Sequence, residues 1–363
     1  MDSQTKKTPS NLEGAKNRQI LLASRPSGEP SQENFKLAET EILTPGPGQM
    51  LLRTIYLSLD PYMRGRMDPG PSYAPRVEIG ELMVGQAVCE VIESNLPGFH
   101  AGDIILAAPG WQDYSLANGE GVRRIDRSLG PISYALGVLG MPGLTAYAGL
   151  LNIGKPQPGE TLVVAAASGA VGSVVGQLGK ILGCRVLGIA GGQQKCTFVK
   201  EELGFDSCLD HRQPDLGDNL KAACPNGIDI YFENVGGPVL DAVLPLLNNF
   251  ARIPVCGLIA HYNDAELSPG PNGVPLLMRA ILVKRLTFRG FIVFDYASQF
   301  PDFITEMTAW LREGRIKYRE DITDGLEHAP RELIRLLKGE NFGKKIIRVN
   351  PEPAQHHSPA QHG

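Results

Sequence analysis

The fold is decided by the stretch Glu160-Thr-Leu-Val-Val-Ala-Ala-Ala-Ser-Gly-Ala-Val-Gly-Ser-Val-Val-Gly-Gln-Leu-Gly-Lys180. A buried strand, a glycine turn and a helix follow one another within it. Residues 162–166 form a continuous apolar run, which is typical of a central parallel strand covered on both faces. Gly169 and Gly172 let the backbone approach a pyrophosphate, and the apolar spacing after them predicts a helix packed on the sheet. The stretch therefore predicts a cradle for the phosphates of a dinucleotide, with contacts from Ser168, Gly169, Ala170, Val171 and Gly172.

The segment after this helix indicates which dinucleotide is bound. A second strand is expected at 185–190, so the glycines lie in a complete strand–turn–helix–strand unit, although glycines that only permit close packing remain an alternative. NAD enzymes carry an acidic residue after the second strand, whereas this chain has Gly191-Gly192-Gln193-Gln194-Lys195. No carboxylate repels a 2′-phosphate there, and Lys195 can reach one, unless it is only a solvated residue opening the next helix. The pattern favours NADPH over NADH, with Gly191 and Lys195 as contacts.

Composition narrows the class of partner. The 363 residues are 42% hydrophobic and 20% charged, as in ordinary globular proteins, and the length favours two domains. The net charge of -4 creates no basic field for nucleic acid or an anionic membrane, and no apolar window is long enough to span a bilayer. Small molecules are therefore the expected partners. The cysteines lack metal or disulfide spacing and are expected to be buried, reduced thiols of a cytoplasmic protein: Cys89, Cys184, Cys196, Cys208, Cys224 and Cys256.

The pattern of short apolar runs predicts an interrupted domain. Residues 17–134 alternate β-type runs with Pro and Gly, which predicts an antiparallel, barrel-like domain, and 135–311 alternate strands with helices, which predicts a doubly wound parallel sheet. A helix and a strand within 312–350 are expected to return to the first domain, while 1–16 and 351–363 are too polar to pack and are expected to be disordered. The expected strands are 19–23, 50–56, 85–92, 103–107, 162–166, 185–190, 207–209, 228–233, 252–258 and 286–291, and a helix is expected at 303–313.

Six motifs occur in order along the chain and carry a family resemblance. They are Leu57-Ser-Leu-Asp-Pro-Tyr-Met-Arg-Gly-Arg66, Gly140-Met-Pro-Gly-Leu-Thr-Ala-Tyr147, Ala166-Ala-Ser-Gly-Ala-Val-Gly172, Tyr231-Phe-Glu-Asn-Val-Gly-Gly237, Cys256-Gly-Leu-Ile-Ala-His-Tyr-Asn263 and Asn341-Phe-Gly-Lys344. With them, the run 19–349 resembles the zinc-independent medium-chain dehydrogenase/reductase superfamily, in the branch of prostaglandin reductases, plant alkenal double-bond reductases and bacterial NADPH-dependent curcumin reductases. The curcumin-reductase group is the most similar of these, because Trp111-Gln-Asp-Tyr114 and Leu209-Asp-His211 also resemble it.

The resemblance implies a GroES-like β-barrel catalytic domain built from both ends of the chain, a central Rossmann domain, NADPH between them, and a homodimer. It also implies that zinc is absent. Where zinc-bearing relatives have Gly-His-Glu this chain has Gly85-Gln86-Ala87, and no Cys occurs in Ser58-Leu59-Asp60, so residues that would hold a metal are missing.

The resemblance also assigns further cofactor contacts. It places Met141, Thr145 and Asn234 beside the nicotinamide, Cys256 among the cofactor contacts, and Phe291 and Val293 in the pocket wall, where they exclude water. At the 2′-phosphate end, His211 stands where the prostaglandin-reductase branch has a tyrosine, and Asn341 matches a family asparagine. His211 as a solvated loop residue and Asn341 as a turn residue remain alternatives.

A site with a hydride donor and uncharged hydrogen-bond donors, but no metal, suits a polarised C=C bond. Hydride adds to the β-carbon of an enone, and fixed donors stabilise the charge that develops on the carbonyl oxygen. Tyr262 is the first candidate donor, because it follows a strand of the parallel sheet, and the resemblance places it beside the nicotinamide as a cofactor and substrate contact. Tyr62 of the first domain is the second catalytic candidate and also a substrate-binding one, and Tyr73 is a substrate-binding candidate of the same domain. Each tyrosine also has a purely structural alternative.

The expected substrates are α,β-unsaturated ketones and aldehydes: curcumin-like dienones, alkenals or lipid enones. Two alternatives share the fold and the cofactor. One is an NADPH:quinone oxidoreductase, and the other is a non-enzymatic NADPH-binding protein.

Overall fold

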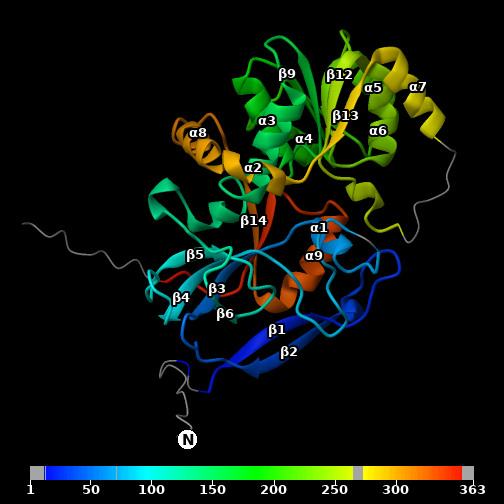
Figure 1. Ribbon diagram of the computed structural model, residues 1–363. Coiled ribbons are helices and arrows are strands. Elements are labelled where there is room, and N and C mark those ends of the chain that lie inside the picture. The colour runs from blue at the N-terminus through cyan, green and yellow to red at the C-terminus, as the bar shows by residue number, and fades with distance from the viewer. Residues whose placement is uncertain (1–11, 13, 71, 265–272, 354–363) are drawn as a thin grey trace, which may run out of the picture.

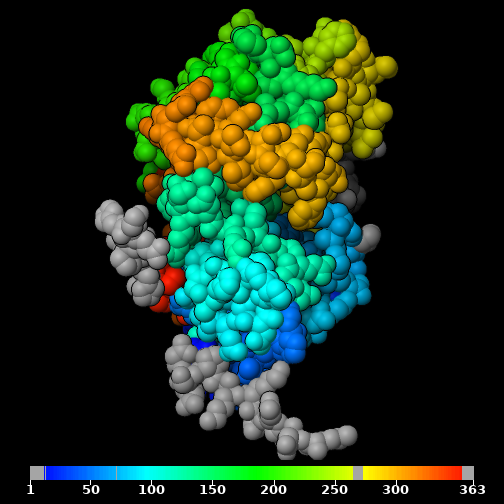
Figure 2. All heavy atoms as spheres, turned by 60° about the vertical axis from the view of Figure 1, so that its left-hand side comes forward, coloured from blue at the N-terminus to red at the C-terminus, as the bar shows by residue number. Residues whose placement is uncertain are grey.

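The computed structural model describes residues 12, 14–70, 72–264 and 273–353, whose elements form two parts stacked on each other (Figure 1). The upper part comes from the middle of the chain, and the lower part combines the first third of the chain with the segment from β14 onward. Figure 2 shows the same two tiers as solid volumes, with the green-to-orange residues above the cyan and blue ones. Most of the predicted leader and tail lies outside the described residues.

The upper part is a six-stranded parallel sheet with the strand order β10-β9-β8-β11-β12-β13. Alternate residues of its strands face opposite ways, because Leu162 and Val164 belong to one apolar cluster and Val163 and Ala165 to another. Helices α2, α3, α4 and α8 cover the first face, and α5, α6 and α7 cover the second. The strands are β8 Thr161–Ala165, β9 Arg185–Ala190, β10 Ser207–Asp210, β11 Ile228–Phe232, β12 Leu247–Val255 and β13 Thr287–Gly290. The helices are α2 Met141–Ala148, α3 Gly172–Ile181, α4 Gln193–Glu201, α5 Leu216–Ala223, α6 Gly237–Val243, α7 Val274–Lys284 and α8 Phe300–Arg312.

This arrangement confirms the predicted doubly wound α/β sheet and corrects one of its strands. β12 begins at Leu247 and ends at Val255, whereas residues 252–258 had been expected. The extension contains a kink, since Phe250 has a φ of +65° and the pairing with β11 shifts register between Ile228 and Ile230. The strand ends earlier because the chain after Val255 turns onto the loop after β11, where the N–H groups of Cys256 and Gly257 both donate to the Glu233 carbonyl.

The lower part is a seven-stranded sheet with the order β14-β15-β3-β4-β5-β7, and β6 also pairs with β3. All its neighbouring strands are antiparallel except β14 and β15, so the expected β-rich first domain is present. A separate ribbon of two strands packs beside it. The strands are β1 Lys16–Leu22, β2 Phe35–Glu41, β3 Met50–Ser58, β4 Ala87–Ser94, β5 Ile104–Ala107, β6 Tyr114–Ala117, β7 Arg123–Arg124, β14 Glu320–Asp324 and β15 Lys344–Arg348.

The return of the chain to the lower part is confirmed. After helix α9, Ala329–Leu337, strand β15 pairs with β3, with Ile346 opposite Ser58. Buried ion pairs fix β15 in place, because Lys344 Nζ lies 2.6 Å from Asp60 and Lys345 Nζ lies 2.7 Å from Glu332. The domain boundaries at 134, 311 and 350 stay predictions.

Two further observations concern the composition-based expectations. The six cysteines are free; four are buried, as expected, whereas Cys208 and Cys256 are only partly covered. Within the described residues, no helix has the length and apolar character needed to cross a membrane.

Candidate active site

The glycine turn has the geometry of a phosphate cradle. After β8, Ala166 adopts a φ of +52°, and α3 begins at Gly172, where a Cβ atom would lie 2.4 Å from the carbonyl oxygen of Ala166. Only glycine therefore fits at that position. Ser168 is buried beside the turn. The Ser173 N–H donates to the Gly169 carbonyl and the Val174 N–H to the Val171 carbonyl, so the N–H of Gly172 is the donor at the start of α3 that stays available to an anion.

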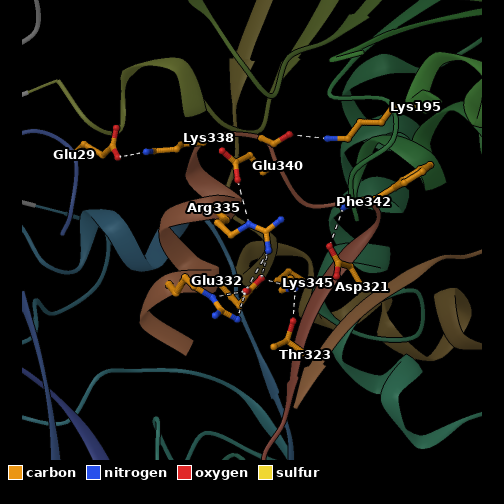
Figure 3. A network of polar contacts seen from close by, with 12 residues as sticks. Glu29, Lys195, Asp321, Thr323, Glu332, Arg335, Lys338, Glu340, Phe342 and Lys345 are labelled. Atoms are coloured by element: carbon orange, nitrogen blue, oxygen red, sulfur yellow. Dashed lines mark hydrogen bonds and ion pairs between the residues drawn. The ribbon is translucent and has the colours of Figure 1, made fainter. Parts of the chain in front are cut away.

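A segment of the lower part closes over this cradle. Residues 339–343 form the closing segment: Gly343 makes a parallel bridge with Gly169, and the Gly339 carbonyl accepts a hydrogen bond of 2.6 Å from Lys195 Nζ. Figure 3 shows Lys195 reaching across to this segment from the upper part. Asn341 lies within it, and its Nδ2 donates to the Gly343 carbonyl over 2.8 Å. Phe342 anchors the segment by packing edge-on against Phe198 of α4, with ring centres 5.0 Å apart.

The end of β9 faces two side chains from the loop after β10. A Cβ atom on Gly191 would lie 2.9 Å from His211 Nε2 and 3.1 Å from Arg212 Nε, so only glycine leaves room for both. Asp210 shapes the turn, since its Oδ1 accepts a hydrogen bond of 2.8 Å from the Gly192 N–H. The structure therefore brings together Gly191 and His211, which the sequence predicted, and Arg212, which it did not.

The electrostatics at this point suit an anion. Burial lowers the pKa of Lys195, and the charge of Arg212 lowers it further, against the opposing effect of Asp321 and Glu340. Burial also lowers the pKa of His211, and Arg212 acts in the same direction. Cationic groups that depress each other's protonation are stabilised by a shared phosphate. Arg212 lies two residues after β10, in a loop where no sequence motif fixes a residue, so the sequence carried no signal for it.

The predicted nicotinamide contacts lie at the carboxyl edge of the sheet and on α2. Asn234 follows β11, and its Nδ2 donates to the Ala165 carbonyl at the end of β8 over 2.8 Å. Glu233 holds this turn, because its Oε1 accepts hydrogen bonds from the N–H groups of Val235 and Gly236. The N–H of Cys256 donates to the Glu233 carbonyl over 2.9 Å, and burial raises the pKa of the Cys256 thiol to about 12. A thiol with this pKa is protonated at neutral pH and does not act as a nucleophile.

On α2, Thr145 and Met141 occupy successive turns of one face. The hydroxyl of Thr145 donates to the Met141 carbonyl over 2.7 Å, and the Thr145 side chain is buried. Neither residue has a contact that tests its predicted place beside the nicotinamide.

Two of the three candidate tyrosines, Tyr62 and Tyr262, pack on the same apolar cluster of the lower part. Tyr262 lies in the segment after β12, a strand of the upper part. It nevertheless packs against the same apolar cluster of the lower part as Tyr62. The Leu258 N–H donates to Tyr262 Oη over 3.3 Å, which orients the phenol. Burial raises the pKa of Tyr262 and of Tyr62, and Tyr73 contributes to both shifts. Tyr73 itself is 59% exposed. Tyr62 and Tyr262 therefore share one apolar cluster, whereas Tyr73 is an exposed neighbour whose charge acts on both phenols.

The two predicted wall residues lie in the upper part. Phe291 packs edge-on against Phe232 and Tyr296, with ring centres 6.3 and 6.1 Å away, and Val293 packs on the same apolar cluster. These contacts place both residues over the sheet, while their role in lining a pocket stays a prediction.

A catalytic zinc does not fit the residues present. Asp60 is held by the buried ammonium group of Lys344 at 2.6 Å and also accepts a hydrogen bond from Ser58. Gln86 and Ala87 offer no imidazole or carboxylate, and in the described part of the chain no three His, Cys, Asp or Glu side chains are grouped closely enough to hold a metal.

Comparison with known proteins shows to which family this chain belongs. Residues 18–125 match the family described as N-terminal domain of oxidoreductase, and residues 170–309 match the zinc-binding dehydrogenase family. The NADPH-dependent curcumin reductase of Escherichia coli (strain K12) is 58% identical over 92% of this chain and 97% of its own length. This chain belongs to the reductase branch of the medium-chain dehydrogenase/reductase superfamily.

Two further members of this reductase branch are also similar to this chain. The solved structure of CurA in complex with NADPH from Vibrio vulnificus has a TM-score of 0.90 and 56% identity, covering 93% of this chain and 100% of the other. The NADP⁺-dependent 2-alkenal reductase of Nicotiana tabacum is 39% identical over 94% of this chain and 99% of its own length. The predicted family and its GroES-like and Rossmann domains are therefore confirmed.

Proposed function

We propose that this protein is an NADPH-dependent oxidoreductase that reduces the C=C bond of α,β-unsaturated ketones and aldehydes, with curcumin-like dienones, 2-alkenals or lipid enones as acceptors. The activities named for its relatives support this substrate class. The observation that carries the proposal is the place of Tyr262. It follows the sheet that forms the cofactor cradle, yet it packs on the core of the other part beside Tyr62. This position between the two parts supports a role for its phenol toward an acceptor bound beside the cofactor.

NADPH fits the residues of the cradle. The glycine turn, with the N–H of Gly172, would hold the pyrophosphate, and Lys195, His211 and Arg212 would hold the 2′-phosphate. Asn341 stiffens the closing segment through its bond to Gly343. Thr145 and Asn234 are proposed to orient the nicotinamide. When bound, NADPH supplies the hydride that adds to the β-carbon of the acceptor.

Tyr262 is proposed to meet the charge that develops on the acceptor's carbonyl oxygen. Burial raises the pKa of this phenol, so it stays protonated at neutral pH and can donate a hydrogen bond to the enolate oxygen or assist protonation of the α-carbon. Tyr62 shares the cluster and keeps its proton for the same reason. Tyr73, on the exposed side, is proposed to contact the rest of the acceptor.

The position of a transferred label tests this function. With deuteride-labelled NADPH and an α,β-unsaturated ketone, we expect the label on the β-carbon of a saturated ketone. Label on the carbinol carbon, with the alkene intact, would make the protein a carbonyl reductase. Turnover of quinones without turnover of enones would favour the quinone oxidoreductase, and NADPH binding without oxidation by any acceptor would leave a non-enzymatic binding protein.

Two further properties belong to the proposal. Activity is proposed to need no zinc, because Lys344 already neutralises Asp60, so chelator treatment should leave turnover unchanged.

The protein is also proposed to form a homodimer. Support comes from α7, which buries none of its residues although Leu276, Met278, Leu282 and Val283 are large and apolar, and from β13, the last strand of the sheet. The cytoplasmic location stays a prediction.

A further inference from the structure

Arg66 is a charged residue next to Tyr62's helix, and the proposed chemistry does not use its charge. It ends the short helix α1, Tyr62–Gly65, four positions after Tyr62, so the two side chains leave the same side of the turn. Its backbone is fixed at both ends, because the Arg66 N–H donates to the Tyr62 carbonyl over 3.3 Å and the Arg66 carbonyl accepts from the Val77 N–H over 2.8 Å.

Neighbouring arginines have acceptors that Arg66 lacks. Arg64 pairs with Asp68 and donates to the Gly28 carbonyl, and Arg76 pairs with Glu78 and donates to the Pro69 carbonyl. Among the described residues, no ion pair includes Arg66, and its buried Nε has no hydrogen-bond acceptor; Arg64 Nε lacks one too, but the other nitrogens of Arg64 are bonded to Asp68 and Gly28. A guanidinium nitrogen buried in this way costs free energy until an acceptor reaches it.

The two carboxylates nearest in sequence are already occupied: Asp68 pairs with Arg64, and Asp60 is held elsewhere. Asp60 binds the buried Lys344 ammonium at 2.6 Å and accepts a hydrogen bond from Ser58. The charge of Arg66 instead acts on the phenols, since it lowers the pKa of Tyr62 and of Tyr73 against the larger effect of burial. The guanidinium is therefore close enough to both phenols to act on their charge, as its place four positions after Tyr62 requires.

We propose that Arg66 selects acceptors that carry an anionic group, a carboxylate or phenolate, at a distance from the enone. This inference rests on the proposed function and names the substrate class of the same site. A guanidinium presents parallel N–H donors that match a carboxylate, and such charge-assisted bonds are about twice as strong as neutral ones. The anionic group satisfies the orphaned nitrogen and places the C=C bond beside Tyr262.

The test compares two acceptors that differ only in charge: an α,β-unsaturated ketone with a remote carboxylate, and its methyl ester. Arg66→Gln should lower kcat/KM for the carboxylate about 10- to 100-fold, and leave the ester within about twofold, because a hydrogen bond to a charged group contributes roughly 1.5–3 kcal/mol. Arg66→Lys should restore part of the loss. Arg76→Gln, an exposed arginine of the same loop, is the matched control and should change neither acceptor.

Binding of the saturated ketones to the NADP⁺ complex, measured by calorimetry, separates this inference from the proposed function. The wild type should bind the saturated carboxylate at least tenfold tighter than its ester, and Arg66→Gln should remove the difference. Equal binding of both, or an equal loss of both in the variant, would overturn the role of Arg66 even if the ester is reduced. Failure to reduce the ester would overturn the proposed function, while the binding preference still decides the role of Arg66.

Discussion

At the scale of single residues, the side chains expected near the cofactor's 2′-phosphate show what one sequence reveals and what it leaves out. Gly191 and Lys195 could be identified because a known position, the end of the second strand, lacks its usual carboxylate. Arg212 could not, since no motif fixes a residue in the loop after β10. Only the fold brings its guanidinium within 3.1 Å of where a Gly191 side chain would begin.

The charges there predict cofactor choice. Lys195→Ala and Arg212→Gln should each weaken NADPH binding by at least about tenfold, or roughly 1.4 kcal/mol, and leave NADH nearly unchanged, because only NADPH carries the 2′-phosphate. Fluorescence titration with both cofactors measures this. Lys200→Ala, an exposed lysine of the same helix, is the control. Equal affinity of the wild type for NADPH and NADH would contradict the assignment.

The proposed role of Tyr262 predicts that its loss lowers turnover but leaves the affinity for NADPH unchanged. Removal of one oxyanion donor typically lowers turnover by ~10²–10³, so Tyr262→Phe should lower kcat by about that factor while NADPH affinity stays the same. Because burial raises the pKa of this phenol, the wild type should not lose activity through its ionisation below about pH 9. Tyr114→Phe, in β6, is the control. A loss under about fivefold would assign the principal donor elsewhere, with Tyr62 as the next candidate.

At the scale of elements, strands with strong apolar runs were predictable and others were not. The runs at β8 and β9 are buried on both faces, so their apolar pattern is unmistakable. β14, Glu320–Asp324, has four polar residues among its five and was missed. It is a strand because β15 lies beside it, and Lys345 of β15 reaches Asp321 and Thr323 (Figure 3). Such tertiary partners leave no local pattern in the sequence.

In the closing segment, two glycines share a positive φ, but their substitution is expected to affect stability differently. Gly339 and Gly343 both have positive φ, +67° and +93°, but a Cβ on Gly343 would lie 2.3 Å from the Arg319 carbonyl oxygen, and one on Gly339 would meet nothing. Gly339→Ala should therefore cost roughly 1–2 kcal/mol of backbone strain. Gly343→Ala should cost more and also weaken NADPH binding, because the bridge to Gly169 must move.

Denaturant unfolding and NADPH titration of the two variants measure these effects. Equal destabilisation by both, with unchanged cofactor affinity, would show that the closing segment can shift freely and does not depend on the contact between Gly343 and Gly169.

At the scale of the whole molecule, the proposed dimer predicts where charge is tolerated. Leu276→Lys and Leu282→Lys, at residues that are 70% and 77% exposed on α7, should shift sedimentation from dimer toward monomer, because a buried ammonium group without a partner opposes association. Leu43→Lys is the matched control, since Leu43 is 64% exposed in the lower part. A monomeric wild type, or an equal shift in the Leu43 variant, would contradict the use of α7 as the interface.

The split of the lower sheet also constrains the order in which the protein folds during synthesis. The upper sheet uses one continuous stretch, 161–290, whereas Lys344 reaches Asp60 across 284 residues of sequence, and β3 gains its neighbour β15 only then. The first strands to leave the ribosome are therefore among the last to be completed. Protease digestion of arrested nascent chains should protect 161–290 before 320–348 emerge and protect 50–117 only afterwards. Early protection of 50–117 would mean that the first strands fold without their distant partner.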